Sequence, residues 1–212
     1  MNLDNIEWLE ESNPVNFNDA VSFMEKRVVQ IIAGEANQLI WIVEHPPLYT
    51  AGVSARDEDL LQKTNIPIYK TNRGGKHTYH GPGMKIIYVM LDLKKIFAPK
   101  APDIARFVEF LENWVIRFLA EFSVKGEIKK GRVGIWVENG GKEEKIAAIG
   151  IKIKKWVSYH GIAININPDL AAFDIIVPCG IKEFGVTSLE KLQKLENKNI
   201  NTIIKKSFTA KV

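Results

Sequence analysis

The chain of 212 residues lacks the features that mark several classes of protein. It has one cysteine, Cys179, so no intramolecular disulfide can form and a disulfide-stapled scaffold is excluded. Its longest apolar run, Ile86–Leu91, has six residues, whereas a membrane-spanning helix needs about 20. Fifteen glycines and nine prolines are too few for a collagen-like or low-complexity chain. With 46% hydrophobic and 25% charged residues, the composition is that of a globular protein that buries its own core.

Neither sign of charge dominates the sequence. The 29 Lys and Arg residues against 25 Asp and Glu residues give a net charge of +4 and an isoelectric point near 9.0. The densest basic stretch, Lys152–Lys155, fits the solvated face of a strand better than the basic stripe of a nucleic-acid-binding protein. A mildly positive surface would still attract an acidic protein partner.

The N-terminal residues Met1–Glu7 resemble neither a secretory signal nor an Arg-rich transit peptide. Together with the single cysteine, this leads us to expect a cytoplasmic protein in a reducing compartment. No repeat, low-complexity tract or linker rich in Pro, Gly and Ser divides the chain. We therefore expect residues 1–212 to form a single domain.

Hydrophobic periodicity predicts four helices and seven strands. Apolar residues at helical spacing predict two long helices and two short ones, over Asn18–Ile32, Pro102–Phe122, Thr187–Leu192 and Ile200–Phe208. Short β-branched or alternating runs predict strands over Leu39–Val43, Ile66–Thr71, Lys85–Leu93, Val124–Ile128, Val133–Val137, Lys145–Lys154 and Ser158–Ile166. Helices mixed with antiparallel hairpins predict a fold of the α+β class, with a mixed β-sheet packed with helices.

The most unusual local stretch is Arg73–Gly83, which lies between two predicted strands. It holds four glycines, a proline, two histidines and an arginine in eleven residues. Glycines allow a backbone to approach a ligand closely, while the arginine and the imidazoles add hydrogen-bond donors. The stretch is either a ligand-binding loop or a glycine-rich turn with histidines in solvent, and its composition alone favours neither.

The single cysteine lies between a proline and a glycine. This setting predicts that Cys179 is on a loop, whereas buried structural cysteines usually lie among aliphatic residues inside an element. A nucleophilic thiol needs exposure, a nearby cation that stabilises the thiolate, and N–H donors for an oxyanion. Gly180 could present such an N–H group. The loop by itself favours an inert thiol over a nucleophile.

Other catalytic patterns have little support. His77, His80 and His160 could together form a three-ligand zinc site, but the sequence has no HExxH pattern and one cysteine cannot make a CxxC pair. It also has neither a GxxxxGK[ST] phosphate-binding loop nor a GxSxG nucleophile elbow.

Six motifs follow one another along the chain: Glu44–Thr50 (EHPPLYT), Arg73–Gly83 (RGGKHTYHGPG), Lys145–Gly150 (KIAAIG), His160–Asn165 (HGIAIN), Val177–Gly180 (VPCG) and Val186–Leu189 (VTSL). In their order and spacing they resemble the motifs of the lipoyl(octanoyl) transferase family. Two departures from the family pattern are visible, Lys76-His77 inside the longest motif and Trp156-Val157, and they bear on chain-length or partner preference.

The resemblance implies the catalytic fold of biotin and lipoate protein ligases. It also implies the first step of protein lipoylation, in which an octanoyl group moves without any cofactor from octanoyl-acyl carrier protein to a lysine of a lipoyl domain. The acceptors would be E2 subunits of 2-oxo acid dehydrogenases and the glycine cleavage H protein. No metal, nucleic acid or membrane is expected. The implied substrate-binding residues are Arg73, Gly74, Gly75, Lys76, His77, Thr78, Tyr79, His80, Ala148, Ile149, Gly150, Gly161, Ile162 and Ala163.

The implied catalytic pair is Cys179 and Lys145. A thioester donor and an amine acceptor suit a cysteine thioester intermediate. A protonated Lys145 would favour the Cys179 thiolate, and a neutral Lys145 could then take a proton from the incoming amine. His80 is preferred over His77 for orienting the thioester, because His77 occupies a variable position. Arg73 would fix the loop or bind a carboxylate.

Two rival functions are kept. An ATP-dependent lipoate or biotin ligase on the same fold would need an adenylate-binding lysine and no cysteine, so the pairing of Lys145 with Cys179 argues for the transferase. A non-enzymatic module that binds acyl groups or nucleic acid is the second rival, and a salt-dependent interaction with DNA or RNA would support it.

Overall fold

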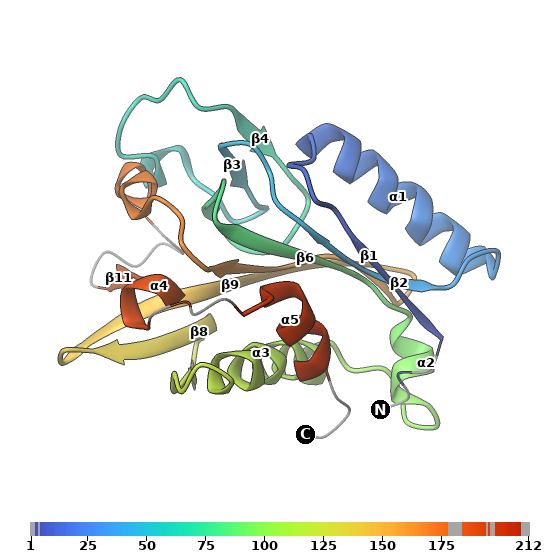
Figure 1. Cartoon of the computed structure of the whole chain (residues 1–212). Coiled ribbons are helices and arrows are strands. Elements are labelled where there is room, and N and C mark those ends of the chain that lie inside the picture. The colour runs from blue at the N-terminus through green and yellow to red at the C-terminus, as the bar shows by residue number, and fades with distance from the viewer. Residues whose placement is uncertain (1–2, 4, 178–183, 194, 196–197, 209–212) are drawn as a thin grey trace.

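The computed structural model describes residues 3, 5–177, 184–193, 195 and 198–208. A twisted, mostly antiparallel sheet forms its centre (Figure 1). Seven of its strands run side by side, and a further short strand, β11 (Gly185–Val186), pairs with β9. The order across the sheet is β1 (Ile6–Glu10), β2 (Gln38–Val43), β6 (Met84–Met90), β10 (Val157–Asn165), β9 (Lys142–Lys154), β8 (Arg132–Asn139) and β7 (Glu127–Lys129).

Within the described part of this sheet, two pairings are parallel and the rest are antiparallel. The parallel pairs are β1 with β2 and β11 with β9. Strand β9 continues into β10 through a tight turn at Lys155 and Trp156, both with positive φ. The turn leaves Lys154 and Lys155 exposed, in agreement with the predicted solvated lysines.

A second, three-stranded sheet lies beside the first, on the side of helix α1 (Figure 1). Its order is β4 (Ile68–Lys70), β3 (Leu48–Ala51) and β5 (His77–His80). Strand β5 runs antiparallel to β3 and lies inside the glycine-rich stretch. That stretch is therefore more than a turn, because part of it is held in register by backbone hydrogen bonds.

Helices cover both faces of the central sheet (Figure 1). Helix α1 (Phe17–Ala33) packs on one face and begins at Asn16, whose side chain accepts the Asn18 N–H at 2.9 Å. Helices α3 (Ile104–Ala120) and α5 (Ile200–Ser207) pack on the opposite face. The shorter helical segments are α2 (Leu93–Phe97), α4 (Leu189–Leu192) and two 3₁₀ turns at Asp57–Asp59 and Leu170–Ile175.

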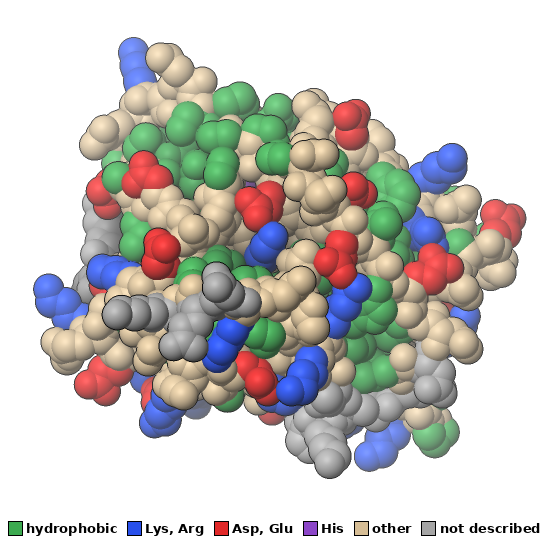
Figure 2. All heavy atoms as spheres, viewed as in Figure 1, with side chains coloured by type: hydrophobic (Ala, Val, Ile, Leu, Met, Phe, Trp, Pro, Cys, Tyr) green, Lys and Arg blue, Asp and Glu red, His purple; other side chains and the backbone are tan. Residues whose placement is uncertain are grey.

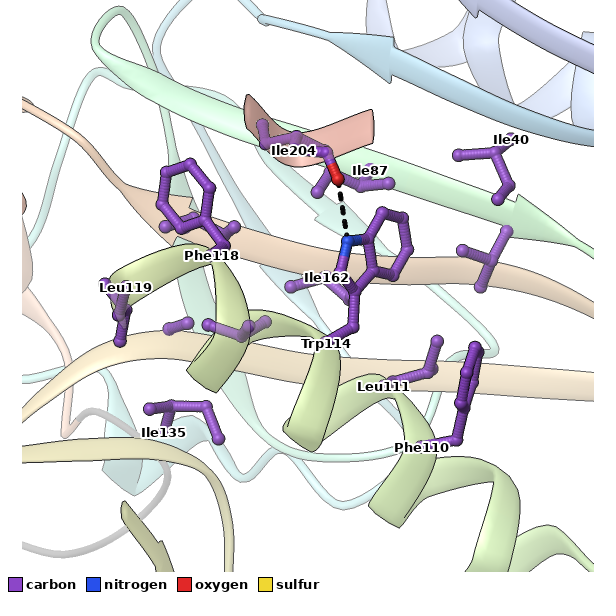
Figure 3. Packing of buried hydrophobic residues seen from close by; sticks show 14 of the residues in the cluster. Ile40, Ile87, Phe110, Leu111, Trp114, Phe118, Leu119, Ile135, Ile162 and Ile204 are labelled. Atoms are coloured by element: carbon purple, nitrogen blue, oxygen red, sulfur yellow. Dashed lines mark hydrogen bonds between the residues drawn. The ribbon is translucent and has the colours of Figure 1, made fainter. Parts of the chain in front are cut away.

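The larger part of the core fills the space between the sheet and helices α3 and α5. Trp114 of α3 is buried there, among residues of the facing strands that include Ile87 and Ile162 (Figure 3). Its indole Nε1 donates a hydrogen bond of 2.9 Å to the Ile204 carbonyl of α5 (Figure 3). This bond joins the C-terminal helix to the core and satisfies the polar atom of a buried aromatic side chain.

The second part of the core lies under helix α1. Met24 and Val28 of the helix pack against strand residues that include Trp41 and Tyr88. Because alternate side chains of a strand point to opposite faces, the central strands contribute to both core regions. Strand β10, which carries one of the sequence motifs, is buried along its whole length.

The predicted α+β class and mixed sheet are confirmed. The long helices differ from prediction by one or two residues at each end. Pro102 is outside α3, because Asp103 caps that helix by accepting the Arg106 N–H at 3.1 Å. The strand predicted over Val124–Ile128 is present but shifted along the chain, since β7 spans Glu127–Lys129. Strands β1, β3, β5 and β11 and helix α2 were not predicted.

Lys and Arg alternate with Asp and Glu over much of the face drawn in Figure 2, and hydrophobic side chains gather on it over the region of β3 and β4. Between residues 48 and 70, the large hydrophobic residues that remain exposed are Val53, Leu61 and Ile68. No helix in the described ranges is both long and apolar enough to cross a membrane.

Candidate active site

A pocket lies between the glycine-rich stretch and strands β9 and β10. It encloses about 570 Å³ of space not filled by atoms, part of it open to solvent. Every predicted substrate-binding residue except Tyr79 lines it: Arg73, Gly74, Gly75, Lys76, His77, Thr78, His80, Ala148, Ile149, Gly150, Gly161, Ile162 and Ala163. The structure thus brings three separate motifs together around one pocket.

Tyr79 points elsewhere. Its ring packs against those of Tyr49 and Phe173, with centroids 5.4 and 5.7 Å away. Burial raises the pKa of the Tyr79 phenol, with a smaller contribution from Asp169. Tyr79 therefore packs against Tyr49 of the small sheet and does not face the pocket.

Arg73 holds the glycine-rich stretch in place. Its side chain is buried, and one terminal nitrogen donates to the carbonyl oxygens of Thr50 at 2.8 Å and Lys76 at 2.9 Å. The same nitrogen donates to the Thr50 hydroxyl at 2.6 Å, and the other terminal nitrogen donates to the Gly74 carbonyl oxygen at 2.9 Å. Of the two roles expected for Arg73, the loop-fixing one matches these contacts.

The stretch lies directly against strand β9. The Gly74 N–H donates to the Ile151 carbonyl at 3.0 Å. At Gly150, a Cβ atom would lie 3.0 Å from the Gly74 carbonyl oxygen and 3.2 Å from the Arg73 Cδ. Glycine at position 150 therefore allows the two backbones to approach and form one wall of the pocket.

Buried aromatic and histidine rings close another side of the pocket. The His45 Nε2 and the Tyr88 hydroxyl are 2.6 Å apart, and the His45 Nδ1 is 2.7 Å from the Val15 carbonyl. Burial lowers the pKa of His45. The pKa of His80 is held well below its usual range, mainly by burial and further by the nearby His45 and Arg73. Both histidines are therefore kept neutral at pH 7.

His160 occupies the start of its motif in strand β10 with an unusual positive φ of 58°. Its ring stacks on Tyr159 and its Nε2 lies 3.3 Å from the Asn72 Oδ1. Burial, assisted by Arg73, lowers the pKa of His160 to about 4. Within the ranges that the structure describes, no three His, Cys, Asp or Glu side chains are placed to hold a metal ion, so His77, His80 and His160 do not form the zinc site considered from sequence.

The variable pair Lys76-His77 is tied to the small sheet and its neighbours. Lys76 forms an ion pair of 3.2 Å with the buried Asp59. Burial is the main cause that lowers the pKa of His77. The Nδ1 atoms of His77 and His80 are buried, and neither has a hydrogen-bond partner among the described residues.

Lys145 lines a second, smaller hollow of about 300 Å³. This hollow shares His77, Thr78 and Ala148 with the larger pocket, so the two adjoin. The Lys145 side chain is 5% exposed. Its Nζ donates to the Val133 carbonyl at 2.8 Å and lies 4.7 Å from the centroid of the Trp136 ring. A buried amine thus lies next to an apolar pocket.

Cys179 is outside the described residues, so its predicted position on a loop is not tested. The chain on both sides of it is described. Before it, the Val177 N–H donates to the Asp59 carbonyl at 2.8 Å. After it, Val186 pairs with Lys145 in the β11–β9 register, and the Thr187 N–H donates to the Lys145 carbonyl at 3.0 Å. The described chain that resumes after Cys179 therefore lies beside Lys145 at Val186 and Thr187.

Sequence reasoning did not assign several residues that line the pocket. Thr50 and His160 belong to recognised motifs and could have been included for that reason. Tyr88 and Ile86 are part of a continuous apolar strand, where nothing in the sequence separates pocket from core. The residues missed are Phe17, Thr50, Ile86, Tyr88 and His160.

Known proteins resemble this chain over nearly its whole length. The family model of the lipoyl protein ligase A/B catalytic domain matches residues 16–209. A relative from Wolbachia sp. subsp. Brugia malayi named octanoyltransferase is 50% identical over 204 residues, which are 96% of this chain and 98% of the relative. An octanoyltransferase from Paramagnetospirillum magneticum is 53% identical over 185 residues, which are 87% of this chain and 85% of the relative.

Solved structures share the fold at low sequence identity. A bipartite lipoate protein ligase from Thermoplasma acidophilum superimposes with a TM-score of 0.70 at 13% identity, with 95% of this chain and 81% of the ligase chain covered. Lipoate-protein ligase A bound with ATP gives a TM-score of 0.68 at 16% identity, with 96% and 83% covered. These likenesses establish the fold, and the relatives at about half identity establish the group. The chain belongs to the family of lipoyl protein ligase A/B catalytic domains and, within it, to the octanoyltransferases.

Proposed function

We propose that this chain takes an octanoyl group from octanoyl-acyl carrier protein onto Cys179 and passes it to a lysine of a lipoyl domain. One observation carries the proposal. The buried amine of Lys145 lines a hollow that adjoins an apolar pocket, through the shared residues His77, Thr78 and Ala148. An acyl chain in the pocket would thus have its reactive end close to a base.

The larger pocket is the proposed site of the octanoyl chain. Its walls include Ile86, Ile149, Ile162 and Ala163, together with glycines that keep the backbone close. Each buried CH₂ group contributes about 0.8 kcal/mol, so an eight-carbon chain can be held by apolar contact alone. Chains that exceed the pocket would be rejected by clash.

The reaction has two steps. The Cys179 thiolate attacks the thioester carbonyl of the donor, the carrier leaves as a thiolate and takes the proton of Lys145, and an octanoyl-cysteine thioester remains. The amine of the acceptor lysine then attacks this thioester, an amide bond forms, and Cys179 leaves as the thiolate. Protonated Lys145 stabilises the thiolate in the first step, and neutral Lys145 accepts the proton of the attacking amine in the second.

His80 and His77 are proposed to orient the thioester. Both are buried beside the pocket, and their Nδ1 atoms have no partner among the described residues. Because burial lowers the pKa of each, both act as neutral hydrogen-bonding groups rather than cations. Arg73 acts through the loop that it fixes, and we assign it no direct chemical step.

The acceptor class follows from the family. The Thermoplasma acidophilum ligase belongs to a lipoylation system together with its E2 lipoyl domain. We propose the same class of acceptor here, with the donor bound as a thioester of an acidic carrier protein. No ATP is required, since the thioester already carries the activated acyl group.

Intact mass spectrometry tests the proposal. The protein is mixed with octanoyl-acyl carrier protein without ATP, beside Cys179→Ser and Lys145→Met. Lys142→Met is a matched control, because Lys142 is an exposed lysine at the start of the same strand. We expect the wild type and Lys142→Met to gain one octanoyl group and to lose it to a lipoyl domain, and Cys179→Ser to gain none.

Two outcomes would contradict the proposal. Octanoylation that persists in Cys179→Ser would remove the cysteine from the reaction. Activity only with ATP and free octanoate would identify the chain as a ligase, despite its similarity to octanoyltransferases.

A further inference from the structure

The long helix α3 carries a buried carboxylate on the side of the sheet opposite to α1. Glu112 is 6% exposed, although a charged side chain at such a position costs free energy unless it is paired. Burial raises the pKa of Glu112 above its ordinary value, and Glu109 adds to this, whereas the Gly134 N–H and the charge of Lys145 act in the opposite direction. A buried carboxylate that interacts with the lysine of the active site calls for a physical explanation.

Among the described residues, a peptide group is the hydrogen-bond partner of Glu112. The Glu112 Oε1 accepts the N–H of Gly134 at 3.1 Å. The carbonyl of the same peptide group, that of Val133, accepts from the Lys145 Nζ at 2.8 Å. In a trans peptide the N–H and the C=O point in opposite directions. The carboxylate and the amine are therefore linked through the two ends of one peptide dipole.

The backbone at this point is shaped around the lysine. Gly134 has a φ of 112°, a conformation that residues with a Cβ rarely adopt. A Cβ there would lie 2.5 Å from the Ala147 carbonyl oxygen and 3.2 Å from the Lys145 Nζ. The register of β8 against β9 shifts close by, between Ile135 and Trp136. The irregularity turns the Val133 carbonyl toward Lys145 and leaves room for its side chain.

We propose that Glu112 is a positioning residue for Lys145, which acts through the Val133–Gly134 peptide group. The carboxylate polarises the peptide, so that its carbonyl becomes a stronger acceptor for the ammonium. This holds the Nζ in one place, beside the pocket. The inference rests on the proposed function, in which Lys145 must carry a proton when the thiolate attacks and must be neutral when the acceptor amine attacks.

Other ionisable groups around this pair must be taken into account. Within the described ranges they are Glu109 on α3, His77 across the second hollow, and Arg132, whose guanidinium lies 4.6 Å from the centroid of the Trp136 ring that also contacts Lys145. Glu109 is exposed and lies three residues before Glu112 on the same helix. It therefore supplies a control of equal charge.

The test compares Glu112→Gln with Glu109→Gln. Glutamine keeps an oxygen that can accept the Gly134 N–H but removes the charge, so the change acts on polarisation more than on packing. Discharge of octanoyl-enzyme to a lipoyl domain is followed by intact mass as a function of pH. In Glu112→Gln we expect the pH profile of the discharge rate to differ from that of the wild type, because the charge that is linked to Lys145 through the peptide group has been removed. The maximal rate should fall about fivefold with an unchanged KM for the acceptor, and Glu109→Gln should follow the wild type.

Superimposable pH profiles for Glu112→Gln, Glu109→Gln and the wild type would overturn the inference. Lys145→Met separates this result from failure of the proposed function. If Lys145→Met still transfers octanoate at the normal rate, the assignment of Lys145 itself is wrong. If Lys145→Met is inactive while Glu112→Gln is unchanged, only the role of Glu112 fails.

A second experiment keeps Glu112 and therefore tests the inference even if Glu112→Gln does not fold. In protein labelled with ¹⁵N-glycine, the Gly134 amide resonance should shift with pH at the same midpoint as the discharge rate. In Lys145→Met that shift should disappear. A Gly134 resonance that does not respond to this titration would refute the link through the peptide group.

Discussion

Replacement of Arg73 by methionine tests whether the loop beside the pocket is held from within. The guanidinium is 8% exposed and donates to the carbonyl oxygens of Thr50, Gly74 and Lys76. Methionine keeps much of the apolar stem and adapts to irregular space, so little cavity is created. The main loss is therefore the set of charged donors that connects β3 to the glycine-rich stretch.

The expected loss of stability in Arg73→Met follows from the three carbonyl groups that lose their donor. Leaving a buried acceptor without its donor costs about 1 kcal/mol at the lower end of measured values. Three acceptors give about 3 kcal/mol, partly offset because the buried guanidinium no longer has to be desolvated. For a chain of this size, we expect the melting temperature to fall by roughly 6 to 12 °C.

Thermal unfolding and acyl loading together form the assay. Arg56→Met is the matched control, because the side chains of Arg56 and of its partner Glu58 are both 71% exposed, and such pairs contribute at most about 1 kcal/mol. Arg73→Met should also load octanoate more slowly, with the larger effect on KM, because residues 73–76 line the pocket. If Arg73→Met melts at the temperature of Arg56→Met, the contacts of the guanidinium do not hold the loop.

Three further predictions concern the pocket wall, the buried histidines and the C-terminal helix. Gly150→Ala places a methyl group 3.0 Å from the Gly74 carbonyl oxygen, so single-turnover acyl loading should slow while the melting temperature changes little. The pKa of His160 is lowered from 6.5 to about 4, so the native state binds fewer protons than the unfolded state. The resulting stability is present above pH 6.5 and is lost as the pH falls toward 4, by up to about 3 kcal/mol. Urea midpoints at about pH 7 and about pH 5 should therefore differ less in His160→Asn than in the wild type. Trp114→Phe removes the 2.9 Å bond to Ile204, which should cost about 1 to 2 kcal/mol and accelerate amide exchange in α5.

Elements with long hydrophobic periodicity were predictable from the sequence. Helix α3 repeats its apolar residues over 17 residues, and β10 is apolar enough to be recognised as a buried strand. Their ends differ from prediction where a local contact decides them. At the start of α3, Asp103 rather than Pro102 marks the boundary because its side chain caps the Arg106 N–H.

The small sheet was only partly predictable, because its pairing depends on residues far apart in the chain. Strand β5 consists of His77–His80, whose two histidines, threonine and tyrosine show no apolar alternation. It becomes a strand through its register with β3, in which Thr50 pairs with Thr78. Strand β1 likewise depends on a parallel pairing with β2, in which Ile6 lies opposite Gln38. Local patterns carry no information about such pairings.

The candidate site, like the fold, was predictable only in part. The site residues were identified through the family resemblance, and those that the structure describes lie around one pocket or its adjoining hollow, apart from Tyr79. Tyr88 was missed because it is one apolar residue in a fully apolar strand. Glu112 was missed because an acidic residue beside the apolar stripe of a helix ordinarily faces solvent. Only the irregular backbone at Gly134 brings a hydrogen-bond donor to it.

The arrangement of the two hollows accounts for the order of the proposed steps. The larger one is apolar and suits the acyl chain, whereas the smaller one is lined by Lys145 and adjoins it through His77, Thr78 and Ala148. An acyl group bound in the larger pocket can therefore stay in place while the donor thiol leaves and the acceptor amine enters. Because β11 pairs with β9 at Lys145, the described chain from Gly185 onward lies beside this junction. The proposed base and the chain that follows the proposed nucleophile thus lie on neighbouring strands of one sheet, and the acyl chain needs to move little between the two steps.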